Sequence, residues 1–248
     1  MEHVVLAVLA ALTAFGFALA AYDAQLFRIY TREDGVVENG TVVALLAGAF
    51  VSFRRVRRLR GRRSGLFLAC TLLLGVLYVA AAGEELSWGQ HFLKFTSPEV
   101  FQRSNAQHET NVHNLVVKGV KINRLVFGTG LFVAIAAYCT MLPAAYRWRP
   151  GTRRLIDGLA LPVPRARHVA WYAVLAFVGS VTPSQYRWEV VELVTATMFL
   201  LFTVLPANAG AFEDAPAGRA SRIGELEPRG GGAGAGARRK RRSRPLVR

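Results

Sequence analysis

The chain has 248 residues, of which 52% are hydrophobic and 19% are charged. The apolar residues come in long uncharged runs, which argues against a soluble domain and predicts a membrane protein. About a third of the 31 Lys and Arg residues lie near the end of the chain, so the basic charge predicts no specific nucleic-acid partner. Cys70 and Cys139 lie inside apolar runs, which excludes a disulfide framework or a CxxC metal site.

Stretches with the length of one membrane crossing, roughly 20 residues, recur along the chain. The first one lacks the basic start and the cleavage site of a signal peptide, so we interpret it as a retained transmembrane helix. The segment 155–164 is too short to cross, and its prolines favour an interfacial position. The sequence predicts an all-α, polytopic transmembrane bundle of about six crossings, near residues 4–22, 37–53, 64–86, 124–145, 168–182 and 188–207.

The distribution of basic residues predicts the orientation of these crossings. Of the 31 Lys and Arg residues, 23 fall in three alternate segments, 53–63, 146–167 and 208–248. The positive-inside rule places these segments, and both termini, in the cytoplasm. We therefore expect a multi-pass protein of the inner or plasma membrane.

The predicted domains follow from the same pattern. We expect a transmembrane domain over 1–207, with a helical outer loop at 87–122 that carries polar motifs. The segment 208–248 is rich in Gly and Arg and cannot bury a core, so we expect a disordered cytoplasmic tail.

The sequence GEELSWGQ, residues 83–90, ends the third apolar run with two adjacent glutamates. An ionisable group at membrane depth costs about 2.5 to 3.5 kcal/mol on insertion scales. Glu84 and Glu85 therefore need a compensating partner or a hydrated cavity. Trp88 suits the aromatic belt of the membrane interface.

The segment RSNAQHETNVHNL, residues 103–115, carries a second polar motif. If it is helical, Asn105, Glu109 and His113 fall at i, i+4 and i+8 and form one stripe. A Glu-x-x-x-His pair has the spacing of two metal ligands, or of a general base and the residue that orients it. We expect this helix to face the same outer leaflet as Glu84.

The last predicted crossing begins with a third group of polar residues. Glu189 and Glu192, at i and i+3, share one side of an otherwise apolar helix, and Trp188 marks the interface. Three separate stretches thus bring carboxylates to the outer leaflet. They either form a working site or a structural network in which Glu, His, Asn and Arg187 satisfy one another.

The two motifs resemble a family of uncharacterised bacterial multi-pass membrane proteins. The matching text is GEELSWGQ (83–90) and NAQHETNVHN (105–114), which lie within one span of some thirty residues. The positions of His91 and His108 are commonly occupied by other residues in that family, so the resemblance does not imply that either is an obligatory ligand. It implies no activity.

The residues of the three stretches give the candidate site. We expect catalytic roles for Glu84, Glu85, Glu109, His113 and Glu192. We expect substrate contacts from Trp88, Gln90, Asn105, Asn111, Asn114, Arg187 and Glu189. A divalent metal is the candidate cofactor, with Glu85, Glu109, His113 and Glu192 as ligands.

Two classes of function fit this site. The first is a membrane enzyme acting on a lipid, isoprenoid or other amphiphile, either by metal-activated water or by carboxylate acid–base chemistry as in small integral-membrane terpene cyclases. The second is proton or cation transport, or a structural membrane subunit. The absence of an internal repeat ranks transport second. The sequence leaves the oligomeric state open.

Overall fold

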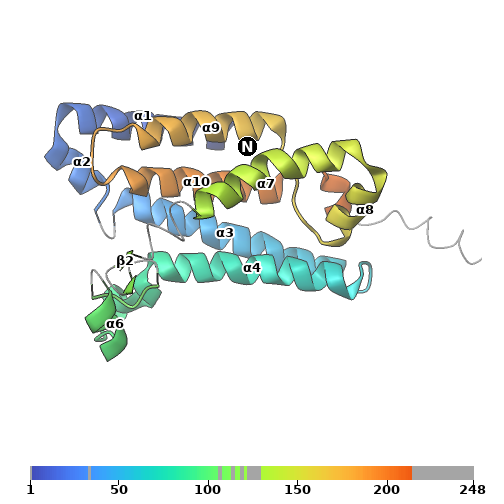
Figure 1. Cartoon of the computed structure of the whole chain (residues 1–248), viewed down its shortest axis with the longest axis horizontal. Coiled ribbons are helices and arrows are strands. Elements are labelled where there is room, and N and C mark those ends of the chain that lie inside the picture. The colour runs from blue at the N-terminus through green and yellow to red at the C-terminus, as the bar shows by residue number, and fades with distance from the viewer. Residues whose placement is uncertain are drawn as a thin grey trace, which may run out of the picture. The chain divides into compact units, whose positions relative to one another are not determined.

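The structure of the chain is a computed structural model that describes residues 2–32, 35–105, 108–112, 115–117, 120–121 and 130–213. These residues belong to one compact unit, Met1–Asp214. A second unit, Ala215–Arg248, lies outside the described residues. In the first unit, long helices run side by side, with short helices and a small hairpin at one end (Figure 1).

Helices make up nearly all of the described fold, which confirms the predicted helical class. The long ones are α1 (Glu2–Tyr22), α3 (Val36–Leu59), α4 (Gly65–Glu85), α7 (Leu131–Trp148), α9 (Ala166–Ser180) and α10 (Arg187–Val204). The shorter ones are α2 (Ala24–Tyr30), α5 (Gln90–Leu93), α6 (Glu99–Ser104), α8 (Pro150–Gly158) and the 3₁₀ turns η1 (Ser87–Gly89) and η3 (Ala209–Phe212). Two strands, β1 (Val116–Val117) and β2 (Val120–Lys121), pair antiparallel.

Four of the described helices, α1, α3, α4 and α7, are long and apolar enough to cross a membrane. This is consistent with a membrane protein. The predicted crossings at 168–182 and 188–207 do form helices, α9 and α10, but neither is among the four. α9 has only 15 residues, and α10 carries Arg187, Glu189 and Glu192. A total of six crossings therefore stays a prediction.

Capping residues set the starts of two helices. Asp23 accepts hydrogen bonds from the backbone N–H groups of Gln25 (2.7 Å) and Leu26 (3.2 Å), and so separates α2 from α1. Ser64 accepts one from Phe67 N–H (3.2 Å) and begins α4 directly after the turn from α3. Each side chain satisfies an N–H group that has no partner within its helix.

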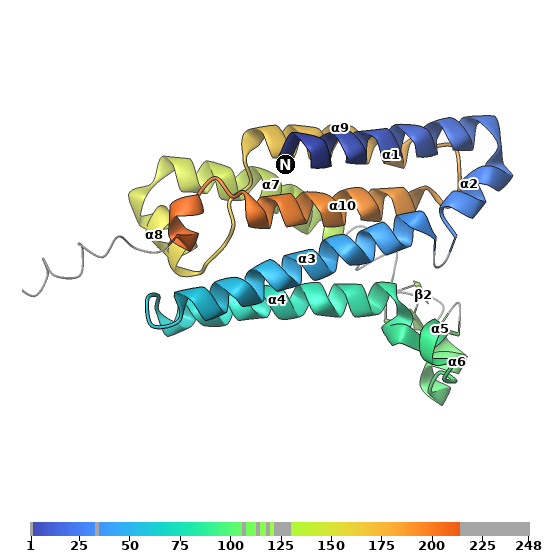
Figure 2. The same cartoon turned by 180° about the vertical axis from the view of Figure 1, so that it is seen from behind.

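α10 lies at the centre of the helices. It packs against α3, α9 and α1, while α3 also packs along α4 (Figure 2). Its buried side chains include Val194, Met198 and Phe202, none of which is measurably exposed. The hydrophobic core around them takes residues from α1, α3, α7 and α9 as well. The acidic start of α10 is therefore held against neighbouring helices.

Glycines let α3 and α4 approach closely. A Cβ atom at Gly48 would lie 2.7 Å from the Tyr78 ring, and one at Gly75 would lie 2.5 Å from the Phe53 ring. The Tyr78 hydroxyl bonds to Phe199 O (2.9 Å) and to Thr203 Oγ1 (2.7 Å), which ties α4 to α10. Small residues at helix contacts are typical of membrane bundles, where close packing contributes much of the association energy.

The predicted helix over residues 103–115 is wrong. α6 ends at Ser104, Asn105 has an extended backbone, and Asn105 pairs with Leu115 in an isolated bridge. Asn and Asp side chains bond readily to nearby backbone groups and so compete with the helix. The described part of this segment is therefore a folded loop, and Asn105 and Glu109 do not share a helix face; His113, the third residue of the predicted stripe, lies outside the described residues.

The opposite end is closed by residues that follow α10. Asn208 is buried, and its Oδ1 accepts a hydrogen bond from Val163 N–H (2.9 Å). Phe212 packs against Phe67, and the Arg55 guanidinium lies 4.3 Å from the centre of the Phe212 ring. The described fold thus continues through Glu213, past the boundary that was predicted at residue 207.

Gly48→Ala tests the close approach of α3 and α4. We expect it to lower the stability by about 1–3 kcal/mol, the usual cost of overpacking, because the Tyr78 ring is anchored through its hydroxyl. The measurement is thermal unfolding in detergent. Gly65→Ala is the control, since a Cβ atom there meets nothing within 4 Å. Equal midpoints for both variants would contradict the packing argument.

Candidate functional site

Three glutamates meet where α4 ends and α10 begins. Ligand oxygens of Glu85, Glu189 and Glu192 lie within 4.8 Å of one another. Glu85 and Glu189 are half-buried and Glu192 is exposed at the surface of the protein. The spacing of Glu189 and Glu192 places both on one side of α10, and the packing of the helices brings Glu85 to them. We call these three residues the glutamate cluster.

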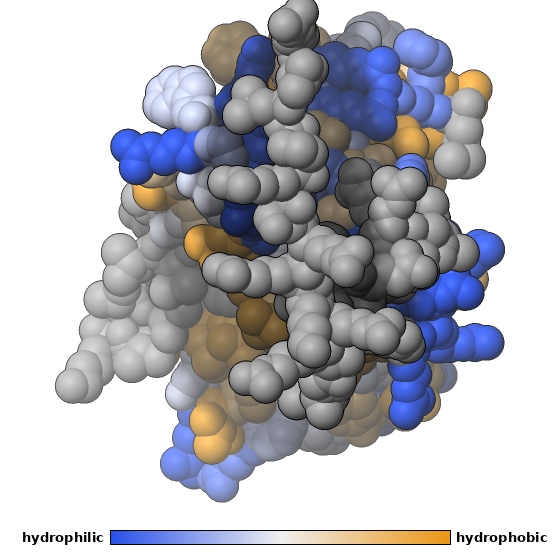
Figure 3. Space-filling model, turned by 90° about the vertical axis from the view of Figure 1, so that its right-hand side faces the viewer, coloured by the Kyte–Doolittle hydropathy of each residue, from blue (hydrophilic) through white to orange (hydrophobic). Residues whose placement is uncertain are grey.

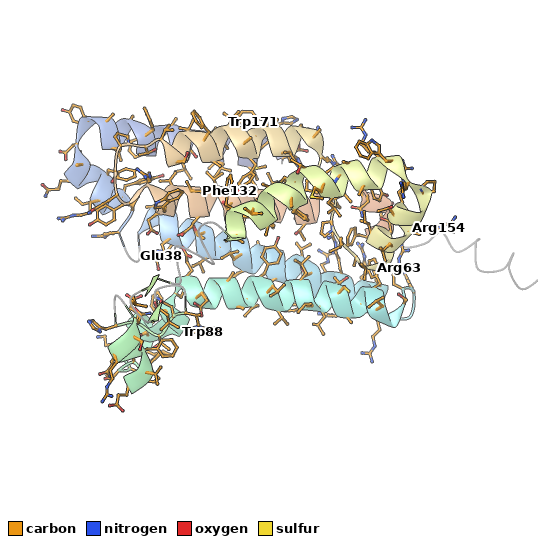
Figure 4. All side chains as sticks on the ribbon, in the orientation of Figure 1. Glu38, Arg63, Trp88, Phe132, Arg154 and Trp171 are labelled. Carbon is orange, nitrogen blue, oxygen red and sulfur yellow. The ribbon has the colours of Figure 1, made fainter. Side chains whose placement is uncertain are left out.

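Another acidic side chain lies near the glutamate cluster, and a basic one begins the same helix. Glu38, near the start of α3, lies within electrostatic reach of Glu85 and Glu192. Arg187 begins α10, and its guanidinium lies 5.3 Å from the centre of the Trp188 ring. Figure 4 shows Glu38 and Trp88 at this end of the bundle and Arg63 and Arg154 at the other. Arg63 and Arg154 thus lie at the end away from Glu38.

The backbone turns sharply directly after α4. Ser87 (φ 45°) and Trp88 (φ 55°) both adopt the left-handed region, which is unfavourable for residues other than glycine, and Gly89 (φ 79°) follows them. The Trp88 ring packs over Gly83, where a Cβ atom would lie 3.0 Å away. Its Nε1–H donates to Glu84 Oε1 (2.9 Å). This turn aims Ser87 inward and fixes the Glu84 carboxylate.

A buried hydrogen-bond network lies beside this turn. Glu109 Oε2 accepts hydrogen bonds from Ser87 Oγ (2.6 Å) and Asn111 Nδ2 (2.8 Å). Asn111 Nδ2 also donates to Ser87 Oγ (2.9 Å). Asn105 Nδ2 donates to the backbone and side-chain oxygens of Asn111, each at 2.8 Å. All four residues are buried, and we call them the Glu109 network.

Two further contacts hold the loop against α4 and α5. Glu84 Oε2 accepts from Val112 N–H (2.6 Å). Gln90 Oε1 accepts from Thr110 N–H (2.8 Å) and from Ser97 Oγ (2.9 Å). The motif at 83–90 therefore contacts residues 105–112 at several points. These contacts explain why both stretches carry polar side chains in an otherwise apolar chain.

The structure brings together most of the predicted site residues, in two groups. Glu85, Glu189 and Glu192 form the glutamate cluster, while Glu109, Asn105 and Asn111 belong to the network. Glu84, Trp88 and Gln90 hold the turn and the loop in place. Arg187 lies at the start of α10. The predicted ligand His113 and the predicted contact Asn114 lie outside the described residues.

Some residues of this region were not singled out from the sequence. Ser87 is one of the two hydrogen-bond donors to Glu109 Oε2 given above, and its place inside the 83–90 motif was an available signal. Ser97 bonds to Gln90 and to His108 O (2.7 Å), but a lone serine before a proline carries no such signal. Glu189 was expected to contact substrate, and the structure places it among the potential metal ligands.

The glutamate cluster has the composition of a cation site. Carboxylate oxygens are hard ligands that suit Mg²⁺, Mn²⁺ or Ca²⁺. Like charges at this separation repel strongly in an apolar surrounding, so a proton, a cation or a basic side chain is needed to reduce the repulsion. The cluster can therefore bind a metal, or hold a carboxylic acid that can donate a proton.

Asn111→Ala tests whether the Glu109 network holds the loop. The change leaves Glu109 and Ser87 with one hydrogen-bond partner fewer, and we expect a loss of about 1–3 kcal/mol of stability, the cost of an unsatisfied buried polar group. The midpoint of thermal unfolding in detergent reports this. Gln25→Ala, which removes an exposed amide, is the control. Equal midpoints would show that the network contributes nothing to the fold.

Comparisons with known proteins do not assign this chain to a family. No protein-family model matches the chain. No curated protein and no solved structure matches it either. The residues and contacts of the site are therefore the ground for assigning it a function.

Proposed function

We propose that this chain is an integral-membrane enzyme that acts on a lipid, isoprenoid or other amphiphile. The observation that supports this best is the glutamate cluster, in which Glu85, Glu189 and Glu192 come together from helices distant in sequence. Ionisable groups at the edge of an apolar bundle are expensive, and such groups commonly mark functional sites in membrane proteins.

A divalent cation held by the cluster is the first form of this proposal. Glu85, Glu189 and Glu192 would hold the ion through their carboxylate oxygens. The ion would supply activated water for the hydrolysis of an ester or phosphoester. Glu109 was predicted as a ligand, but its Oε2 accepts two hydrogen bonds within the network. We therefore assign it a positioning role, while a role for His113 stays a prediction.

The surface near the motif supports an amphiphilic substrate. Trp88, Phe92 and Leu93 are between 51% and 74% exposed, and Val100 on α6 is 69% exposed. Aromatic and aliphatic side chains of this kind are stable at the interface between headgroups and acyl chains. A substrate with a polar head and an apolar tail could place its head at the cluster while its tail stays in the lipid.

The Glu109 network gives the site its rigidity. A catalytic group acts best when its position is fixed before substrate binds. Glu84 and Gln90 bind backbone N–H groups of the loop, so the loop and the end of α4 move as one piece. Asn105, Asn111 and Ser87 complete this support.

The proposed topology has six crossings, with α9 and α10 added to the four apolar helices. The central position of α10 in the hydrophobic core supports this, because a helix packed on several membrane helices must share their depth. Arg63 and Arg154 lie at the end opposite Glu38 (Figure 4). The positive-inside rule then places the site at the outer leaflet of the inner or plasma membrane, and both termini in the cytoplasm.

Transport of protons or cations by the same cluster is the alternative. A path through the bundle needs polar groups that can pass an ion along. The buried hydroxyls of Thr13, Thr41, Ser52 and Thr71 instead donate to backbone carbonyls one turn earlier in their own helices. They are satisfied locally, which favours a site at one end over a path.

Metal analysis of the purified protein tests the enzyme proposal. We expect a stoichiometric divalent metal in the wild type and its loss in Glu85→Gln and in Glu192→Gln, because each change removes a charged ligand. Glu99→Gln is the control, since Glu99 is exposed and pairs with Arg103. Metal retained in both cluster variants would contradict the assignment. A folded wild type without metal would leave carboxylic-acid catalysis as the form to test.

Cysteine labelling tests the topology. In a chain with Cys70→Ala and Cys139→Ala, Glu99→Cys should react with a membrane-impermeant maleimide in right-side-out vesicles. Arg154→Cys should react only after permeabilisation, because it lies at the opposite, cytoplasmic end. Both positions are exposed, so access to the reagent decides the result. The reverse pattern would invert the topology and place the site in the cytoplasmic leaflet.

A further inference from the structure

A cavity lies at the end of the bundle opposite the glutamate cluster. Its volume is about 400 Å³, and it opens between the end of α7, the start of α8 and the segment before α9. Its lining includes Arg147, Arg153 and Arg165, together with Pro143, Val163 and Pro164. We call it the arginine cavity. Figure 3 views this end and shows hydrophilic residues arranged around apolar ones.

The charges of the arginine cavity are of one sign. None of the described residues that line it is acidic. The nearest acidic group in sequence, Asp157, does not line the cavity; it accepts hydrogen bonds from Asn208 Nδ2 (2.9 Å) and from the hydroxyl of the lining residue Tyr146 (3.4 Å). Within the described part of the chain, the Arg147 guanidinium makes no hydrogen bond or ion pair. Three guanidinium groups around one hollow attract an anion with several oxygen atoms.

The cavity is built by contacts that fix its walls. Arg153 Nε donates to Tyr146 O (2.6 Å) and its Nη2 donates to Arg147 O (3.2 Å), so it caps the last carbonyls of α7. On the other wall, Ala207 N–H donates to Val163 O (2.7 Å). Asn208 holds the same segment through Val163 N–H and Leu161 O. The cavity therefore does not depend on a mobile surface loop.

The surroundings decide which anion fits. Met141, Trp148 and Leu155, on the same two helices, are between 61% and 80% exposed. Exposed apolar side chains next to arginines are typical of the membrane interface, where basic pockets between helices bind phospholipid headgroups. We propose that the arginine cavity binds the phosphate of an anionic phospholipid from the cytoplasmic leaflet. This site is separate from the glutamate cluster; it rests on the proposed topology but not on the proposed enzyme activity.

Native mass spectrometry of the full chain in detergent, titrated with dioleoylphosphatidylglycerol, tests this proposal. We expect retained lipid, and an affinity about fivefold lower in Arg147→Gln, the usual effect of one basic residue near an anionic membrane. Arg147 is chosen because its side chain makes no described hydrogen bond or ion pair, so its replacement should leave the fold intact. Arg149→Gln is the matched control, since it removes the same charge from an exposed neighbour that does not line the cavity.

Two comparisons separate the lipid from its chemical relatives. Dioleoylphosphatidylcholine, which carries no net charge, should be retained far less than the anionic lipid. Inorganic phosphate, which has the same oxygen atoms without acyl chains, should not displace the bound lipid at equal concentration. Equal effects of Arg147→Gln and Arg149→Gln would overturn the proposal. So would equal retention of the two lipids, or binding of phosphate in the absence of any lipid binding.

Discussion

Repulsion among the carboxylates of Glu85, Glu189 and Glu192 is the constraint on which this end of the molecule depends. Three acidic groups within 4.8 Å can stay together only if protons, a cation or a basic side chain offset their charge and if the surrounding structure holds them in place. α10 supplies two of them from the centre of the bundle, and α4 supplies the third. The buried Glu109 network fixes the turn that follows α4.

The sequence predicted this juxtaposition where local rules apply. Glu189 and Glu192 lie one turn apart on a helix, and their common side follows from helical periodicity alone. From the charge asymmetry of the chain, Glu85 and Glu192 were predicted as ligands of one site together with Glu109 and His113, while Glu189 was predicted as a substrate contact. The apolar runs likewise predicted the long helices. Each such run must bury its hydrophobic side chains in the protein or expose them to lipid, and a helix satisfies its backbone groups in both cases.

The loop after α4 could not be predicted in the same way. Asn105, Glu109 and Asn111 have a spacing that suits a helix, yet their side chains bond to one another and to Ser87. These bonds satisfy polar groups that a helix would leave without partners, and they depend on the turn at Ser87 and Trp88. Two successive non-glycine residues with positive φ are not encoded by local preference, so the shape of this loop is set by tertiary contacts.

The order of the helices along the chain has a consequence for membrane insertion. The contacts of Gly48 with Tyr78 and of Gly75 with Phe53 join α3 to α4, which follow each other directly. α10 is synthesised long afterwards. In the proposed topology, α3 and α4 therefore enter the bilayer as a helical hairpin that already carries Glu85, and that acid stays at the membrane edge until α10 arrives. Assembly of the site is thus a late step of biogenesis.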